Sequence, residues 1–298
     1  MMVVMNMEAV VINMAKGIDT RCIECFQKTY LRLRKKYFFT KQQSKEFSEF
    51  MQKLMEDKDV LSSPEIQREL HHKLYELSGV TDPFYEEKKQ SNHIALNLYK
   101  YWKQKLSVSE NPFNMALRLS IAGNIMDFGA NHSFNIFKTI EDVFVTKFAI
   151  DHSELLKERI SKAKNILYLG DNAGEIVFDK LFIETIHNRN VCFVVKGSPI
   201  INDVTMDDAY EVNMHDVADV ISNGYDAPST VLKKSSLLFQ EMFKSADLII
   251  SKGQGNLEGL LNENDSRIFF LLTVKCEVIA ESIGVQKGSF VVYNQSKL

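Results

Sequence analysis

The sequence has few cysteines and no long apolar run, and each shortage argues against a class of protein. Four cysteines in 298 residues are too few for a disulfide framework. No stretch reaches the roughly 18 apolar residues that a membrane-spanning helix needs. The apolar start, MMVVMNMEAVVINMA, lacks the basic region of a secretion signal and is interrupted by polar residues. We therefore expect a cytoplasmic protein with no membrane partner.

A large charge of one sign is also missing. The formal net charge is −3, so no strong basic field points to nucleic acid as a partner. The local basic cluster RLRKK at residues 32–36 fits the solvated face of a helix. Hydrophobic residues make up 45% of the chain and charged residues 25%, which is ordinary for a globular protein with a sizeable core.

Two of the cysteines, Cys22 and Cys25, form a C-x-x-C motif. Zinc would need a second pair, and Cys192 and Cys276 stand alone. A thioredoxin-like motif would open a helix after a strand, whereas both flanks of this motif show helical spacing. A buried or half-buried thiol pair is the simpler interpretation, and redox and metal roles remain alternatives.

The two parts of the chain differ in hydrophobic pattern. Residues 18 to about 160 show the spacing of amphipathic helices, with capping residues and early prolines at the expected starts. These starts are Thr40, Ser63–Pro64, Asp82–Pro83, Asn111–Pro112, Ser133 and Ser153. We expect a helical N-terminal bundle or cap over residues 1–160 and a second region, with a different pattern, over residues 161–298.

Residues 161–298 alternate short β-branched runs with helical segments. Most of the runs are apolar without alternation, as in strands covered on both faces. They lie at 165–169, 191–196, 216–221, 247–251, 267–272 and 289–293, with helices expected at 174–189, 204–213, 229–244 and 275–283. This order predicts an α/β fold with a Rossmann-like, mostly parallel sheet and helices on both faces.

The turn after the first of these strands, in LYLGDNAGEIVFDKL (167–181), carries polar side chains. Asp171 and Asn172 stand where a strand meets a helix, and ligands of open α/β sheets bind at the carboxyl ends of strands. Gly174 permits close backbone approach, and the helix that follows favours an anion such as phosphate. Because Asp171 is itself an anion, a phosphate beside it requires a bridging cation.

A third oxygen ligand for such a cation follows the next strand. Asp203 stands before a helix start in KGSPIINDVTMDDA, at the same end of the predicted sheet. With Asp171 and Asn172 it makes a set of hard oxygen donors, which suits Mg²⁺ or Mn²⁺ better than zinc. The acids at 207 and 208, further along, are expected to be solvated residues of the first helical turn.

Lysines mark the same edge of the sheet. Strands end at or just before Lys196, Lys252 and Lys275. Lys252 is followed by Gly253, and lysine together with exposed glycine amides provides a phosphate subsite. Several lysines on one rim, facing an acid–amide–acid set, indicate phosphate recognition more strongly than any one of them would.

One polar pair stands out in the helical part. Asn124 and Asp127, in LRLSIAGNIMDFGAN, are spaced to share one otherwise apolar helix face, where an amide and an acid need partners. They are either a capping or helix-packing pair, or part of a lid that touches the substrate.

Taken together, these segments resemble the damage-control phosphatase family (domain of unknown function 89). The matching pieces occur in family order in both parts of the chain: GNIMD (123–127), GDNAGEIVFD (170–179), KGSPIINDVT (196–205), SKGQGN (251–256) and KCEVIA (275–280). The C-x-x-C motif is similar to that of the family's short microbial branch. The set is specific, although any one piece alone is weak.

The resemblance implies a helical N-terminal region on a Rossmann-like core. It also implies a phosphatase of small phosphometabolites that depends on a divalent metal, active with Mn²⁺, Co²⁺ or Ni²⁺ and less so with Mg²⁺. The family's metal ligands fall on Asp171, Asn172 and Asp203. Its substrate-side residues fall on Asn124 and Asp127, and the lysine of its K-G motif falls on Lys252.

The predicted reaction is hydrolysis of a phosphate monoester, such as a sugar phosphate or a phosphorylated cofactor intermediate. Lys252, the Gly253 amide and the helix after Asp171 would share the negative charge. A metal-positioned water is the first candidate for the attacking group and Asp171 the second, although the acid–x–acid pattern of haloacid dehalogenases is absent. Glu175 and Asp127 are candidates for acid or base, and Glu175 has the alternative role of a first-turn helix acid.

Two other functions remain alternatives at this stage. LYLGDNAGE has a faint likeness to the glycine-rich turn of a methyltransferase that uses S-adenosylmethionine, but that cofactor needs neither a metal nor a rim of lysines. A non-catalytic protein that binds phosphometabolites would have the same pocket, and turnover would exclude it.

Overall fold

A computed structural model describes residues 18–56, 61–123, 140, 143–187 and 190–297. The chain divides into two compact units, one up to Val80 and one from Thr81 onward. Each unit has its own buried core and is described by itself. The predicted boundary after residue 160 differs from this division, because the helices between 81 and 160 belong to the compact unit that holds the sheet.

The first unit consists of helices α1 (Thr20–Lys36), α2 (Lys41–Glu56) and α3 (Ser63–Ser78). Their apolar stripes meet in a core that includes Tyr30 and Phe47, both fully buried. The predicted cap of α2 is confirmed, since the Thr40 hydroxyl accepts a hydrogen bond from the Gln43 amide at 3.2 Å. Cys22 and Cys25 lie one turn apart on α1 and do not form a disulfide, and the first is half-buried whereas the second is exposed.

The second unit begins with helices α4 (Tyr85–Ser107), α5 (Pro112–Gly123) and α7 (Ser153–Lys162). The helices predicted from the Asp82–Pro83, Asn111–Pro112 and Ser153 signals are therefore confirmed. The predicted continuation of α5 past Gly123, and most of the helix expected from Ser133, lie outside the described residues. In the described part of the chain, no helix is long and apolar enough to cross a membrane.

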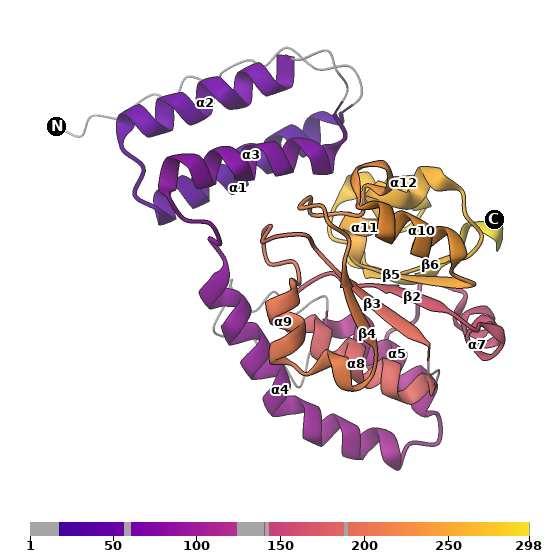
Figure 1. Cartoon of the computed structure of the whole chain (residues 1–298). Coiled ribbons are helices and arrows are strands. Elements are labelled where there is room, and N and C mark those ends of the chain that lie inside the picture. The colour runs from indigo at the N-terminus through magenta and orange to yellow at the C-terminus, as the bar shows by residue number, and fades with distance from the viewer. Residues whose placement is uncertain (1–17, 57–60, 124–139, 141–142, 188–189, 298) are drawn as a thin grey trace. The chain divides into compact units, whose positions relative to one another are not determined.

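A seven-stranded sheet forms the centre of this unit (Figure 1). Its strands, in chain order, are β1 (Ile150–Asp151), β2 (Ile166–Leu169), β3 (Val191–Val195), β4 (Asp219–Ser222), β5 (Leu248–Lys252), β6 (Ile268–Thr273) and β7 (Phe290–Tyr293). The spatial order is β1-β7-β6-β5-β2-β3-β4. All neighbouring pairs are parallel except β6 and β7. The predicted α/β class is thereby confirmed.

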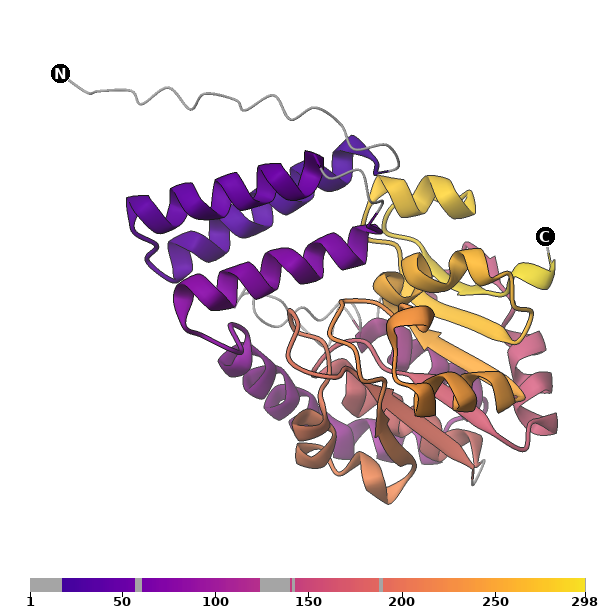
Figure 2. The same ribbon diagram turned by 45° about the horizontal axis from the view of Figure 1, so that its top comes forward.

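Helices cover both faces of the sheet, as Figures 1 and 2 show. Helices α5 and α8 (Glu175–Ile186) pack on one face, and α10 (Leu237–Ser245), α11 (Gly253–Leu260) and α12 (Glu277–Ile283) on the other. Alternate strand residues enter the two cores, Tyr168 on one side and Leu167 and Leu169 on the other. This double coverage explains why the strand sequences are apolar without alternation.

Strand β2 lies at the point where the order of the sheet reverses. From β2 the chain builds outward through β3 to β4 on one side, and β5 and β6 lie on its other side. In open α/β sheets, ligands bind outside the carboxyl ends of the strands at such a switch point. The loops that follow β2, β3 and β5 therefore define where a functional site is expected.

Candidate active site

The structure brings the predicted acid–amide–acid set together. Asn172 and Asp203 face each other in an isolated antiparallel bridge outside the named strands. On either side of it, the Val204 amide donates to the Asp171 carbonyl at 2.8 Å and the Ala173 amide donates to the Asn202 carbonyl at 2.9 Å. Backbone hydrogen bonds thus join the loop after β2 to the loop after β3, at the carboxyl edge of the sheet.

Gly253, at the end of β5, lies directly against the Asp171 carboxylate. Its backbone has φ +76°, and a Cβ built there would lie 1.9 Å from Asp171 Oδ2. Both the left-handed conformation and the contact require glycine at this position. The backbone that follows strand β5 therefore packs directly against the Asp171 side chain.

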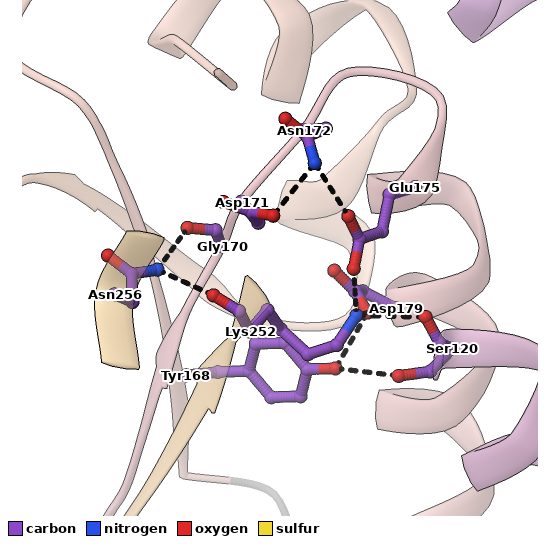
Figure 3. A network of polar contacts seen from close by, with 9 residues as sticks. All are labelled: Ser120, Tyr168, Gly170, Asp171, Asn172, Glu175, Asp179, Lys252 and Asn256. Carbon is purple, nitrogen blue, oxygen red and sulfur yellow. Dashed lines mark hydrogen bonds and ion pairs between the residues drawn. The ribbon is translucent and has the colours of Figure 1, made fainter. Parts of the chain in front are cut away.

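The Asn172 side chain connects two carboxylates, as Figure 3 shows. Its Nδ2 donates to Asp171 Oδ2 at 2.7 Å and to Glu175 Oε2 at 3.2 Å. In this arrangement the amide oxygen points away from both acids. Glu175 stands in the first turn of α8, as one alternative of the sequence analysis had it, and its side chain is fully buried.

Lys252 points into the protein rather than toward an open rim. Its Nζ donates to Glu175 Oε1 at 2.5 Å, to Asp179 Oδ1 at 2.6 Å and to the Ser120 carbonyl at 2.9 Å (Figure 3). An ammonium has three hydrogens, so this fully buried lysine has all its donors in use. The arrangement offers counter-charge to Glu175 and Asp179, whereas the sequence predicted direct contact between Lys252 and phosphate.

Asp179 is a member of this network that the sequence analysis missed. It accepts a hydrogen bond from the Tyr168 hydroxyl at 2.8 Å in addition to the one from Lys252. Burial raises the pKa of its carboxyl to about 6, although the charge of Lys252 opposes the shift. A signal was present in the sequence, since Asp179 follows Glu175 by one helical turn on an otherwise apolar helix.

Lys196 provides counter-charge on the other side of the site. It is buried, and its Nζ lies 3.5 Å from Asp203 Oδ2 and donates to Asn256 Oδ1 at 3.0 Å. Asn256 in turn donates to the carbonyls of Gly170, at 3.1 Å, and Lys252, at 2.8 Å. This amide therefore ties the ends of β2, β3 and β5 together.

Two further groups were predicted to contact phosphate, the Gly174 amide and the Lys275 side chain. The Gly174 amide donates to Asn92 Oδ1 at 2.7 Å, so that N–H is already engaged with α4. Lys275 is exposed, its amide donates to Gln254 Oε1 at 2.8 Å, and its charge lowers the pKa of Asp171. Of the three lysines predicted at this edge, Lys196 and Lys252 are buried, and Lys275 is the one with an exposed side chain.

Asp171 and Asp203 are held in conditions that disfavour negative charge. Burial, and then the charge of Glu175, raise the pKa of Asp171 to about 6. Burial raises the pKa of Asp203 to about 7, with Lys196 opposing and Asp171 adding to the shift. Asp203 Oδ2 is buried and accepts no hydrogen bond from any described residue. Lys196 faces this oxygen at 3.5 Å without a hydrogen bond to it, so the buried pair of acids keeps an acceptor that a bound cation would fill.

The donor chemistry of this set fits a divalent cation. Two carboxylates and an amide are hard oxygen donors of the kind that Mg²⁺ and Mn²⁺ bind. Within the described ranges, no group of three or more histidine, cysteine or acidic side chains has the geometry of a metal site. The predicted set has only two acids, so it relies on Asn172 as the third ligand.

Two further predictions about the site have different outcomes. Asn124 and Asp127 lie outside the described residues, which stop at Gly123, where a Cβ would lie 3.1 Å from Glu175 Cγ. Asp207 is exposed, as predicted for a first-turn acid. The same prediction is wrong for Asp208, which is buried and lies 3.0 Å from Lys88 Nζ.

Comparison with known proteins identifies the family of the chain. Residues 18–291 match the damage-control phosphatase ARMT1-like domain. The chain is 40% identical to damage-control phosphatase PH1575 of Pyrococcus horikoshii over 230 residues, which covers 76% of this chain and 79% of that protein. It is 35% identical to a damage-control phosphatase of Archaeoglobus fulgidus over 229 residues, covering 74% of this chain and 79% of that protein.

A solved structure gives the same result for the fold. The crystal structure of a DUF89 family protein from Pyrococcus horikoshii superposes with a TM-score of 0.85 at 33% identity, and covers 93% of this chain and 99% of that one. The fold thus places the chain in the class of α/β proteins to which this DUF89 structure belongs. The chain belongs to the ARMT1-like damage-control phosphatase family, and the predicted resemblance is confirmed.

Proposed function

We propose that this protein is a divalent-metal-dependent phosphatase that hydrolyses phosphate monoesters of small metabolites. The observation that carries the proposal is the joining of Asp171 and Asn172 to Asp203 at the switch point of the sheet, against Gly253. The names of the relatives support the reaction class. Sugar phosphates and phosphorylated cofactor intermediates are the substrates we expect.

Asp171, Asn172 and Asp203 would hold the metal through their side-chain oxygens, and for this the Asn172 amide would turn so that its oxygen, rather than Nδ2, faces the two acids. Mn²⁺, Co²⁺ and Ni²⁺ are the ions we expect, with Mg²⁺ also possible. When bound, the metal supplies positive charge that polarises a phosphoryl oxygen. The pKa values of Asp171 and Asp203 are raised by burial. A bound cation would stabilise the ionised forms of both acids, so both could act as ligands.

Residues of this chain would bind the rest of the phosphate charge. Helix α11 starts at Gly253, beside Asp171, and the first amides of a helix have no acceptor within it. Lys275 adds a lysine charge at the same edge, where Gln254 holds its backbone. Lys252 contributes indirectly, since it fixes Glu175, which in turn accepts from Asn172.

Water is the attacking group that this geometry favours. The Asp171 carboxylate is held by the Asn172 amide and lies against Gly253, which suits a fixed ligand better than a nucleophile that must move. Attack by water forms a new P–O bond, breaks the ester P–O bond and releases an alcohol that takes a proton. Glu175 has both oxygens engaged, with Lys252 and with Asn172, so Asp127 is the remaining candidate for proton transfer.

The test is phosphate release from p-nitrophenyl phosphate and a panel of sugar phosphates. The chelator-treated protein is assayed alone and after addition of Mn²⁺, Co²⁺, Ni²⁺ or Mg²⁺. The proposal predicts metal-dependent turnover that Asp171→Ala abolishes and that Asp207→Ala, a change at an exposed acid, leaves intact. Absence of turnover with every metal, together with tight binding of S-adenosylmethionine, would replace the phosphatase with a methyltransferase.

A further inference from the structure

A single buried amide from α4 connects the two loops that carry the acid–amide–acid set. Asn92 is fully buried, and its Oδ1 accepts from the Gly174 amide at 2.7 Å. Its Nδ2 donates to Asp208 Oδ1 at 3.2 Å and to Glu211 Oε2 at 2.6 Å. Gly174 begins α8, and the two acids belong to α9 (Met206–Glu211).

Both ends of this connection lie close in sequence to the proposed ligands. Gly174 follows Asn172 by two residues, and its backbone has φ +79° at the N-cap of α8. Asp208 caps the start of α9, because its Oδ2 accepts from the Thr205 amide at 2.9 Å and from the Thr205 hydroxyl at 2.7 Å. Thr205 follows Asp203 by two residues.

Helix α4, which carries Asn92, also provides the counter-charge for Asp208. Lys88, one turn before Asn92 on α4, places its Nζ 3.0 Å from Asp208 Oδ2 and 3.0 Å from Asp82 Oδ2. With Lys88 as counter-charge, Asp208 stays an acceptor for Asn92 and Thr205 at once. One face of α4 thus holds the start of α8 and the start of α9 through side-chain hydrogen bonds.

We propose that Asn92 is a positioning residue that sets the distance between the Asp171–Asn172 turn and Asp203. The inference rests on the proposed metal-dependent function. The position needs an amide, because only an amide presents an acceptor to Gly174 and donors to Asp208 and Glu211 from one short side chain. An aspartate there would repel both acids, and an apolar residue would leave the Gly174 amide and a carboxylate buried without this partner.

The expected consequence of losing Asn92 is weaker binding of the cation. Groups that orient metal ligands without touching the metal typically change metal affinity by about 10- to 100-fold. We expect a loss of that size for Asn92→Leu, which keeps the shape of the side chain, and for Asn92→Ser, which keeps only a short hydroxyl. The neighbouring variant His93→Ala, on the exposed side of α4, should bind as the wild type does.

The test is calorimetric titration of Mn²⁺ into the chelator-treated full chain, well below the melting temperature of each variant. Weakened binding in both Asn92 variants, with His93→Ala unchanged, supports the positioning role. Wild-type affinity in a folded Asn92 variant overturns it, even if that variant melts earlier, because a merely structural residue would lower stability alone.

The same titration separates this inference from the function on which it rests. If the wild type binds none of Mn²⁺, Co²⁺, Ni²⁺ and Mg²⁺ in this titration, the proposed function fails and the inference fails with it. If the wild type binds Mn²⁺ and the Asn92 variants bind equally well, only the inference fails. If Asn92→Leu does not fold, the Mn²⁺ affinity of Asn92→Ser tests the inference instead.

Discussion

Asp171 and Gly253 lie in contact at the ends of the adjacent strands β2 and β5, where a Cβ on residue 253 would lie 1.9 Å from Asp171 Oδ2. No side chain fits between the carboxylate and this backbone. Because Gly253 also starts α11, the same residue fixes the place of Asp171 and directs a helix N-terminus toward it.

The first prediction concerns Gly253→Ala. The new methyl group displaces the Asp171 carboxylate, so we expect kcat/KM for p-nitrophenyl phosphate to fall by about 100-fold or more, since a misplacement on the order of 1 Å has that effect. The matched control is Gly284→Ala, because Gly284 has φ +72° but open space around its Cα. Both variants carry backbone strain of about 1–3 kcal/mol, measured by urea unfolding. Equal activity in the two variants would contradict the role of the contact.

A second prediction follows from the burial of Lys252. Lys252→Met leaves the buried carboxylates of Glu175 and Asp179 without their counter-charge, so we expect the free energy of unfolding of the sheet unit to fall by about 3–5 kcal/mol. Adding Asp179→Asn to this variant removes one of the two charges and should restore part of the loss. Lys244→Met, at an exposed position, should change stability by less than about 0.5 kcal/mol. A Lys252→Met protein as stable as this control would mean that the network carries no charge.

The third prediction is a pH dependence in the first unit. Burial lowers the pKa of His71 from 6.5 to about 4, and its Nδ1 contacts the Tyr30 hydroxyl. The unfolded chain therefore binds a proton between these two values while the folded unit does not. Stability should be full above about pH 6.5 and fall progressively toward pH 4, by up to about 3 kcal/mol. Hydrogen exchange in α1–α3 measures this loss.

His71→Phe provides the control for that experiment. It removes the titrating group, so the free energy of opening of α1–α3, obtained from exchange after correction for the intrinsic exchange rate at each pH, should lose most of its dependence on pH between about 6.5 and 4. An unchanged pH profile in this variant would assign the effect to other groups.

A fourth prediction is stabilisation by the metal. A ligand that binds only the folded state adds about 2.7 kcal/mol of stability at a concentration 100-fold above its dissociation constant. We expect Mn²⁺ to raise the melting temperature of the sheet unit in the wild type and in Asp207→Ala, and to have no effect in Asp171→Ala. Equal stabilisation of all three proteins would place the bound ion outside the proposed site.

The sheet and the meeting of the two loops were predictable from the sequence for a physical reason. Apolar strands covered on both faces leave a strong pattern, and parallel strands end at the same edge of a sheet. These two facts place Asp203 at the same end of the sheet as Asp171 and Asn172, whereas the bridge that sets it opposite Asn172 is seen only in the structure. The boundary near residue 160 was less predictable, because the sequence shows that α4 and α5 are helices but not which core they join.

Side-chain direction and long-range partners were not predictable. The side chain of a lysine at a strand end, such as Lys252, can point to solvent at the edge of the sheet or into the protein core. Its position in the sequence does not distinguish these two directions. Helix α11 was missed because Gly253 and Gly255 read as a loop, although the first of them starts a helix. Asn92 was missed because no sequence spacing links it to Gly174, which is 82 residues away.

The most direct test of the central claim is anomalous diffraction from crystals of the full chain soaked in Mn²⁺ at saturating concentration. The account predicts one strong anomalous peak at bonding distance from side-chain oxygens of Asp171, Asn172 and Asp203. Two results would contradict the proposed metal site: no anomalous peak although these side chains are well ordered, or a strongest peak that lies beside other residues.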